Sequence, residues 1–215
     1  MLGRVARLPA RGFKTGALFS TVVEDEVRKF NAASSDWWAP KSTTGVGPLH
    51  QINPVRVKYI RSHVIGHFGR TTDDDPMPLR GLRVADVGCG GGILSEALCR
   101  IGGTMVSADP GEDNIAAAKN HAAMSRHTSS IDYRQCTSAA LAIGAAEYVM
   151  RIVPPGTHDW NKFVQPGEIE TELRKDGFTV KDVSGIVGDP IFRSWCIHPT
   201  CTDINYILCA TKPQE

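Results

Sequence analysis

The sequence has no stretch of about 18 consecutive apolar residues, which a membrane-spanning helix requires. It also has no excess of either charge, with 24 Lys and Arg against 23 Asp and Glu, so the basic surface of a nucleic-acid-binding protein is not indicated. Its six cysteines have no regular spacing, which favours free thiols over a disulfide framework. What the chain does have is 215 residues, 41% of them hydrophobic, enough for one domain with a hydrophobic core.

Acidic residues are missing from the first part of the chain. Residues 1–23 contain Arg4, Arg7, Arg11 and Lys14, and the first acid is Glu24. A basic, acid-free stretch with hydroxyl side chains is typical of a mitochondrial transit peptide, although a disordered N-terminus can have a similar composition. The sequence therefore predicts a transit peptide at residues 1–22 and one folded domain at residues 23–215.

A glycine-rich segment follows the first predicted strand. Residues 82–87 form a short apolar run typical of a buried parallel strand, and five residues with four glycines, 88–92, come directly after it. A helical pattern at 93–101 ends at a glycine pair. Strands at 104–108 and 131–135, with a helix at 113–124 between them, continue the alternation. The pattern predicts an α/β fold, with a Rossmann-like parallel sheet and helices on both faces.

The rest of the chain predicts further elements. Helices are expected at 22–38, 53–68, 139–153 and 166–176, and two closing strands at 178–183 and 204–210. For the second of these helices, Asn53 is the expected N-cap and Pro54 the first helical residue. The paired Trp37 and Trp38 are expected to serve as a lid or in core packing.

A glycine turn between a strand and a helix has a chemical use. Glycine lets the backbone approach a ligand closely, and the following helix presents free N–H groups. Asp109 ends the second strand 21 residues after Gly88, where a carboxylate can accept both hydroxyls of a ribose. The dinucleotide signature G-x-G-x-x-G/A does not fit, because Ile93 or Ser95 falls at its third glycine.

The segment from Asp86 to Gly92 resembles the first motif, D/E-x-G-x-G-x-G, of class I S-adenosylmethionine-dependent methyltransferases. A structural glycine turn in another α/β protein is the alternative. The chain resembles in particular the ubiquinone-biosynthesis O-methyltransferases, including mitochondrial ones, which methylate polyprenyl catechols. Five stretches carry this resemblance, the last of them weakly: Lys29-Phe30 with Trp37-Trp38, Pro48 to Arg56, Val84 to Leu94, Gly144 to Trp160, and Asp203 to Tyr206.

The resemblance implies roles for three residues. Arg56 would contact the methionine end of S-adenosylmethionine, for which a guanidinium is well suited because that end carries a carboxylate. Gly88 would line the adenosine cleft and Asp109 would hold the ribose. No catalytic residue is assigned: His158 could act as a general base, but anchoring the next helix is the preferred interpretation.

The resemblance also implies a location. Residues 139–153, with the following 156–160, are similar to the family's membrane-facing insertion, and their composition suits a peripheral bilayer contact. A buried helix is the alternative. The expected place is the matrix side of the mitochondrial inner membrane, the expected substrate is a polyprenyl catechol, and other quinone-biosynthesis proteins are possible partners. No nucleic-acid partner is expected.

An internal segment of the family pattern is missing from the sequence. Residues 135–138 run almost directly into 141–144, where the family has its fourth and fifth strands and an E-x-x-E-H motif for a divalent metal. Two strand–helix units, roughly 60 residues, are therefore expected to be absent near residues 138–141. The family's Mg²⁺ has no ligand motif here, so no metal residues are assigned.

The missing segment has a structural consequence. The family's strand order is 3-2-1-4-5-7-6, so the loss removes the centre of the sheet. Either the closing strands pair with the first strand, or the chain does not fold cooperatively. The sequence thus leaves two hypotheses: an O-methyltransferase, or a catalytically impaired splice form or gene-model fragment that only binds the cofactor or acts as a scaffold. A zinc module at Cys196, His198 and Cys201 is disfavoured, because the spacing matches no paired-cysteine pattern.

Overall fold

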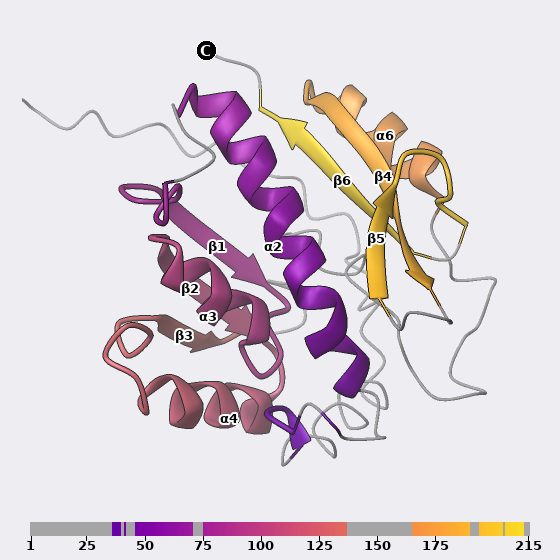
Figure 1. Cartoon of the computed structure of the whole chain (residues 1–215). Helices are drawn as coiled ribbons and strands as arrows, with labels where there is room; N and C mark the ends of the chain where they lie inside the picture. The colour runs from indigo at the N-terminus through magenta and orange to yellow at the C-terminus, as the bar shows by residue number, and fades with distance from the viewer. Residues whose placement is uncertain are drawn as a thin grey trace, which may run out of the picture.

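The computed structural model describes residues 36–39, 41, 46–70, 75–136, 165–189, 194–203 and 205–212. The predicted segments 1–22 and 139–160 lie outside these ranges. Among the described residues, no helix is both long enough and apolar enough to cross a membrane. The described elements form two three-stranded sheets, with one long helix between them (Figure 1).

The first sheet is parallel, and the glycine turn follows its first strand. Its strands are β1 (Arg83–Val87), β2 (Thr104–Asp109) and β3 (Asp132–Gln135), in the order β1-β2-β3. Helices α3 (Ile93–Arg100) and α4 (Glu112–Ala122) connect them. Apolar side chains from these elements form one core, with Leu98, Met105, Ile115 and Tyr133 among its buried members. The predicted alternation of strands and helices is confirmed here, with element ends shifted by only one or two residues.

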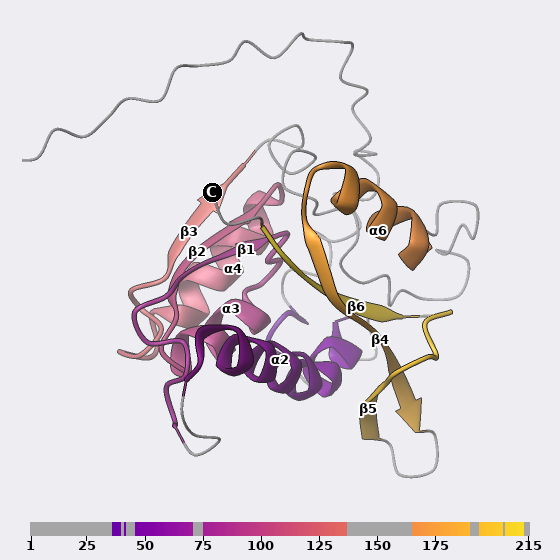
Figure 2. The same ribbon diagram turned by 90° about the horizontal axis from the view of Figure 1, so that it is seen from above.

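The second sheet is antiparallel. It consists of β4 (Thr179–Asp189), β5 (Ser194–His198) and β6 (Tyr206–Thr211), in the order β5-β4-β6. Helix α6 (Pro166–Lys175) packs on the face of this sheet that is turned away from α2 (Figure 2). A hydrogen-bonded capping box between Gln165 and Glu168 fixes the start of α6. The sequence predicted α6, β4 and β6 but not β5.

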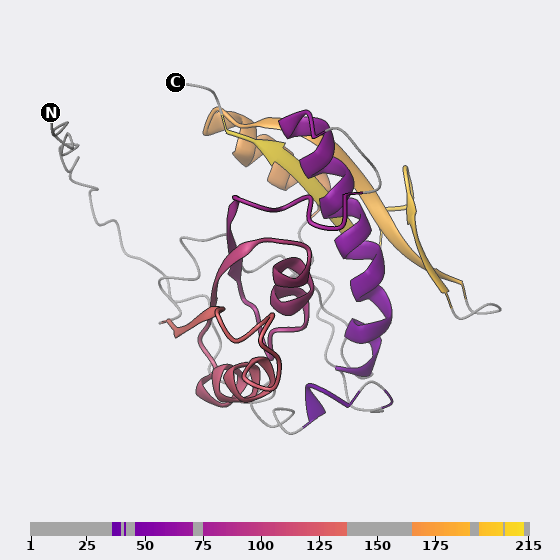
Figure 3. The same cartoon turned by 60° about the vertical axis from the view of Figure 1, so that its left-hand side comes forward.

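Helix α2 (Gly47–Phe68) lies between the two sheets in the views of Figure 1 and Figure 3. It contacts α3 on one side and β5 on the other. The helix starts six residues before the predicted N-cap Asn53, and Pro54 lies inside it. That prediction was wrong because Pro48 takes the position in the first turn where proline is tolerated. The side chain of Asn53 instead donates to the carbonyl of Ile93 in α3.

Within the described residues, the closing strands do not pair with the first strand. Strand β1 pairs with β2, and β6 pairs with β4. The family strand order would place the fourth strand beside β1 and the fifth beside β6. The two sheets are therefore separate where the family pattern has one continuous sheet, and α2 connects them through side-chain contacts.

The contact between α2 and β4 is polar. The hydroxyl of the buried Tyr59 donates to Asp182 Oδ2 over 2.6 Å, and Ser184 Oγ donates to the same oxygen over 2.8 Å. His63 Nε2 lies 3.9 Å from it. Burial alone would raise the pKa of Asp182, but the hydrogen bonds from Tyr59 and Ser184 and the nearby His63 bring it below its ordinary value. The ionised carboxylate is thus the form that holds α2 on the second sheet.

Replacing Tyr59 with phenylalanine tests this contact. We expect the free energy of unfolding to fall by about 1–2 kcal/mol, because the ring stays buried while the hydrogen bond to a carboxylate is lost. Urea denaturation measures the change. Lys175→Ala, which removes an exposed ion pair on α6, is the control and is expected to stay within about 0.5 kcal/mol of the parent. Equal losses in the two variants would contradict the prediction.

The effect of Tyr59→Phe should also depend on pH. The pKa of Asp182 is lower in the folded chain than in the unfolded chain. The stability that this group contributes is therefore fully present above the unfolded value of about 3.9 and is lost as the pH falls through the folded value. The unfolding free energies of parent and variant should approach each other below about pH 4.

Candidate cofactor site

The glycine turn joins β1 to α3. Gly88 has a φ of +79°, in the left-handed region that favours glycine, and its N–H donates to the carbonyl of Ala108 in β2 over 2.8 Å. The next N–H, of Cys89, donates to the same carbonyl. The turn is therefore held against the carboxyl end of β2, next to Asp109. Burial raises the pKa of the Cys89 thiol, which agrees with a packing role for this small side chain.

Asp109 points at the glycine turn. The residue is 7% exposed, and its Oδ2 accepts the N–H of Gly90 over 2.9 Å. Its Oδ1 accepts from the N–H of Gly111 over 2.8 Å and from Asn114 Nδ2 over 3.1 Å. A carboxylate has about four acceptor positions, and within the described part of the chain three of them are filled, which leaves one on Oδ2. The expected role of Asp109 in holding a ribose stays a prediction.

Arg56 lies on α2 and is buried, with 9% of its surface exposed. Its Nη2 donates to Asn53 Oδ1 over 2.7 Å, whereas its Nε has no hydrogen-bond partner among the described residues. Burial lowers the pKa of the guanidinium, and the negative charge of Asp86 opposes this shift. A buried N–H without a partner is costly, so this side chain is suited to receive an anionic group.

Asp86 is a second carboxylate near the glycine turn, and its charge interacts with that of Arg56. It belongs to β1, and its Oδ2 accepts the hydroxyl of Ser95 over 2.6 Å. Burial raises the pKa of Asp86, while the hydrogen bond from Ser95 and the charge of Arg56 oppose the shift. The three predicted residues therefore converge only in part. Gly88 and Asp109 share one edge of the parallel sheet, whereas Arg56 lies on α2, with Asp86 as its nearest opposite charge in the site.

Trp37 fills one side of the glycine turn. A Cβ on Gly90 or Gly91 would overlap its indole, and a Cβ on Gly92 would overlap the hydroxyl of Tyr133. The interpretation that these three glycines make room for a ligand was wrong in this structure, because their missing side chains make room for aromatic rings of the protein. For Gly88, the expected place beside the adenosine stays a prediction. Trp37 is 5% exposed and packs with Ile93, which confirms core packing for this residue.

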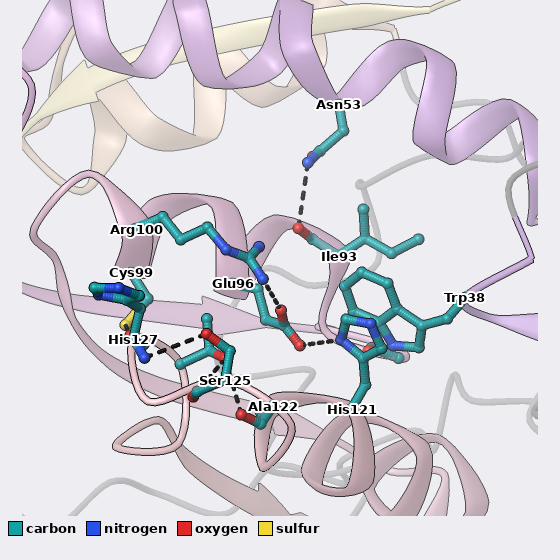
Figure 4. A network of polar contacts seen from close by, with 12 residues as sticks. Trp38, Asn53, Ile93, Glu96, Cys99, Arg100, His121, Ala122, Ser125 and His127 are labelled. Atoms are coloured by element: carbon teal, nitrogen blue, oxygen red, sulfur yellow. Dashed lines mark hydrogen bonds and ion pairs between the residues drawn. The ribbon is translucent and has the colours of Figure 1, made fainter.

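Trp38 is held by a second set of contacts (Figure 4). Its indole N–H donates to the carbonyl of Gly91 over 3.1 Å, and its ring stacks on His121 with 3.4 Å between centroids and 3° between planes. His121 Nδ1 lies 2.6 Å from Glu96 Oε1, and Arg100 Nη2 donates to Glu96 Oε2 over 2.7 Å. Glu96 is fully buried. The sequence did not reveal Asn114, His121 and Glu96 as part of the site, because the contacts of Asn114 with Trp37 and of Glu96 with His121 join residues 77 and 25 positions apart.

His198, one of the three residues of the disfavoured zinc module, has a structural role. His198 Nδ1 accepts backbone N–H groups of Thr200 and Cys201, so its imidazole holds the turn after β5. No group of three or more His, Cys, Asp or Glu that could hold a metal occurs within the described ranges. His158 and the membrane-facing segment lie outside them.

The fold is found in known methyltransferases. Magnesium protoporphyrin IX methyltransferase from Synechocystis PCC 6803, solved with bound S-adenosylmethionine, has a TM-score of 0.58 at 14% identity, covering 93% of this chain and all of that chain. The same protein with bound S-adenosylhomocysteine has a TM-score of 0.55 at 13% identity, covering 88% of this chain and 99% of that one. At this identity the likeness establishes the fold alone, which confirms the predicted class I methyltransferase fold.

Sequence relatives are closer. The model of the Methyltransferase domain family matches residues 85–152. The ubiquinone biosynthesis O-methyltransferase of Azorhizobium caulinodans is 36% identical over 242 residues, which covers 88% of this chain and 93% of the relative. The protein of the same description from Cereibacter sphaeroides is 33% identical over 248 residues, covering 91% of this chain and 98% of that one.

These matches extend over more positions than the chain has residues. For the Azorhizobium protein, 88% of 215 residues is about 189, so about 53 of the 242 positions have no counterpart here. This size is close to the two strand–helix units that the family pattern has and this sequence lacks. Despite that gap, similarity covers about nine tenths of the chain, and the chain belongs to the ubiquinone biosynthesis O-methyltransferase family.

Proposed function

We propose that this chain binds S-adenosylmethionine at the β1–α3 turn, for the O-methylation of a polyprenyl catechol in ubiquinone synthesis. The observation that carries the proposal is the place of Asp109: a buried carboxylate beside a glycine turn, with one acceptor position left for a sugar hydroxyl. The unpartnered Nε of Arg56 fits the carboxylate of the cofactor's methionine end. Residues present in the chain thus match both ends of this cofactor.

Each residue contributes to binding in a different way. The bound cofactor supplies an electrophilic methyl group on a sulfonium. Gly88 lets the main chain come close to the adenosine, because no side chain stands there. Asp109 and Arg56 fix two distant points of one ligand, and such a fixed orientation is what methyl transfer to a phenol oxygen requires.

A second candidate function is cofactor binding without turnover. It is favoured by the separation of the two sheets among the described residues and by the absence of E-x-x-E-H from the whole sequence. Without that motif the chain lacks the family's ligands for Mg²⁺, which would otherwise lower the pKa of the catechol oxygen. A shortened splice form or gene-model fragment would have these properties.

Two measurements on the purified chain distinguish the candidates. Calorimetry with S-adenosylhomocysteine is expected to show one site per chain, and Arg56→Gln is expected to weaken binding about tenfold by removing a charge-assisted contact. Arg61→Gln, a change five residues along the same helix, is the control. Absence of binding to the parent chain would refute the proposed site.

The second measurement is methyl transfer to a catechol with added magnesium. Turnover dependent on S-adenosylmethionine supports the enzyme. Binding without turnover supports the second candidate.

We also propose that residues 1–22 direct the chain to mitochondria, where it contacts the matrix face of the inner membrane. The support is compositional: four basic residues and no acid in this segment. Import of a reporter fused to residues 1–22 tests the targeting, and a cytosolic reporter would contradict it. Lipid vesicles with and without a polyprenyl catechol test the membrane contact by co-sedimentation.

A further inference from the structure

The tryptophan turn, residues 36–39, reaches the Asp109 carboxylate through one side chain. Trp37 Nε1 donates to Asn114 Oδ1 over 2.8 Å, and Asn114 Nδ2 donates to Asp109 Oδ1 over 3.1 Å. Trp37 and Asn114 are 5% and 3% exposed, so water does not replace either hydrogen bond. The three side chains form a continuous relay from the tryptophan turn to the carboxylate.

This relay fixes the orientation of the Asn114 amide. An indole N–H can only donate, so the atom of Asn114 that faces Trp37 is the oxygen. The NH₂ group then faces Asp109, where it donates to Oδ1. Together with the Gly111 N–H it fills the acceptor positions of Oδ1 and leaves the free position on Oδ2. Trp37 therefore determines which carboxylate oxygen remains available.

The tryptophan turn is held in place by further contacts with the glycine turn, α4 and α2. Trp38 donates to the Gly91 carbonyl and stacks on His121, which Glu96 holds in place (Figure 4). The backbone carbonyl of Trp37 lies 2.7 Å from His50 Nε2 on α2. These contacts place the Trp37 indole independently of its bond to Asn114, so the N–H is presented to the amide by a fixed framework.

From this geometry we propose that Trp37 is a positioning residue for the ribose of the cofactor, acting through Asn114 on Asp109. The inference rests on the proposed function, because it assigns the free Oδ2 position to a ribose hydroxyl. Trp37 does not touch the cofactor in this scheme. Its N–H keeps Asn114, and through it the carboxylate, in the orientation that accepts the hydroxyl.

Two matched variants separate positioning from packing. Trp37→Phe removes the N–H that Asn114 accepts and keeps an aromatic ring against Gly91, although the outer ring atoms beside Gly90 are lost. Trp38→Phe removes the N–H bound to the Gly91 carbonyl and leaves the relay intact. The first readout needs no ligand: amide hydrogen exchange at Gly111, whose N–H bonds to Asp109 Oδ1. Trp37→Phe is expected to speed this exchange about tenfold, and Trp38→Phe is expected to leave it within about twofold. Unchanged exchange at Gly111 in Trp37→Phe would overturn the proposal.

The second readout is binding of S-adenosylhomocysteine and of its analogues lacking the 2′- or 3′-hydroxyl. Trp37→Phe is expected to weaken binding of the parent ligand about fivefold, but to weaken binding of one of the deoxy analogues less than twofold. A packing role would weaken all three ligands equally, and that result would also overturn the proposal. Failure of the unmodified chain to bind any of them would instead refute the proposed function, while the exchange at Gly111 would still decide whether the relay exists.

Discussion

Gly91→Ala is expected to lower the free energy of unfolding by about 3 kcal/mol, because a methyl group at this position would overlap Cγ, Cδ2 and Cβ of Trp37. These atoms lie near the start of the side chain, so rotation of the ring does not relieve the overlap. The tryptophan turn has to leave the glycine turn. Chemical denaturation gives the stability change, and the fluorescence of Trp37 and Trp38 reports their exposure to water.

The matched control is Gly66→Ala on the exposed face of α2, where a Cβ would meet no atom within 4 Å. It is expected to raise stability by about 0.5–1 kcal/mol, since alanine loses less backbone entropy in a helix. If the two alanine variants behaved alike, the packing of Trp37 on the glycine turn would not be a determinant of stability.

The second large effect is expected for Asp109→Asn. The amide keeps the size of the carboxylate but loses its charge. In the parent chain the N–H groups of Gly90 and Gly111 both donate to the carboxylate, and in the variant at least one of them faces an NH₂ group instead. We expect a loss of about 2–4 kcal/mol in unfolding free energy, because hydrogen bonds to ions are the stronger ones. Binding of S-adenosylhomocysteine should weaken at least tenfold.

Asp132→Asn is the comparison for that substitution. Asp132 is an exposed carboxylate on β3 paired with Arg134, and its removal should change stability little. Isothermal calorimetry and urea unfolding on both variants give the two numbers. A stable Asp109→Asn variant with undiminished affinity would show that the carboxylate neither stabilises the glycine turn through Gly90 nor binds the ribose.

The local part of the site could be predicted from the sequence. A strand, a glycine turn, a helix and an acid after the next strand follow one another within about 30 residues, and parallel pairing brings their ends together. For that reason the sequence could place Gly88 and Asp109 at the same edge of the sheet. Strand β5 was missed because Ser194–His198 is short and mixes polar, aromatic and apolar side chains without a clear alternation.

The long-range part of the site could not be predicted in the same way. Trp37 and Asn114 are 77 residues apart along the chain, and no periodic pattern connects them. In a sequence, glycines such as those at 90 and 91 can leave room either for a ligand or for a neighbouring aromatic ring. Only the position of Trp37 in the structure decides between these two interpretations. The start of α2 was ambiguous in a similar way, because either Pro48 or Pro54 could have occupied the first turn of the helix.

The long helix has a mechanical consequence for ligand binding. Arg56 and Tyr59 are three residues apart on α2, hence on the same side of it, and both are buried. Tyr59 donates a hydrogen bond to Asp182 in the antiparallel sheet, whereas Arg56 interacts electrostatically with Asp86 in the parallel sheet. Any sliding or tilting of one sheet against the other would therefore move the Arg56 guanidinium, and with it the contact that we propose for the methionine end of the cofactor.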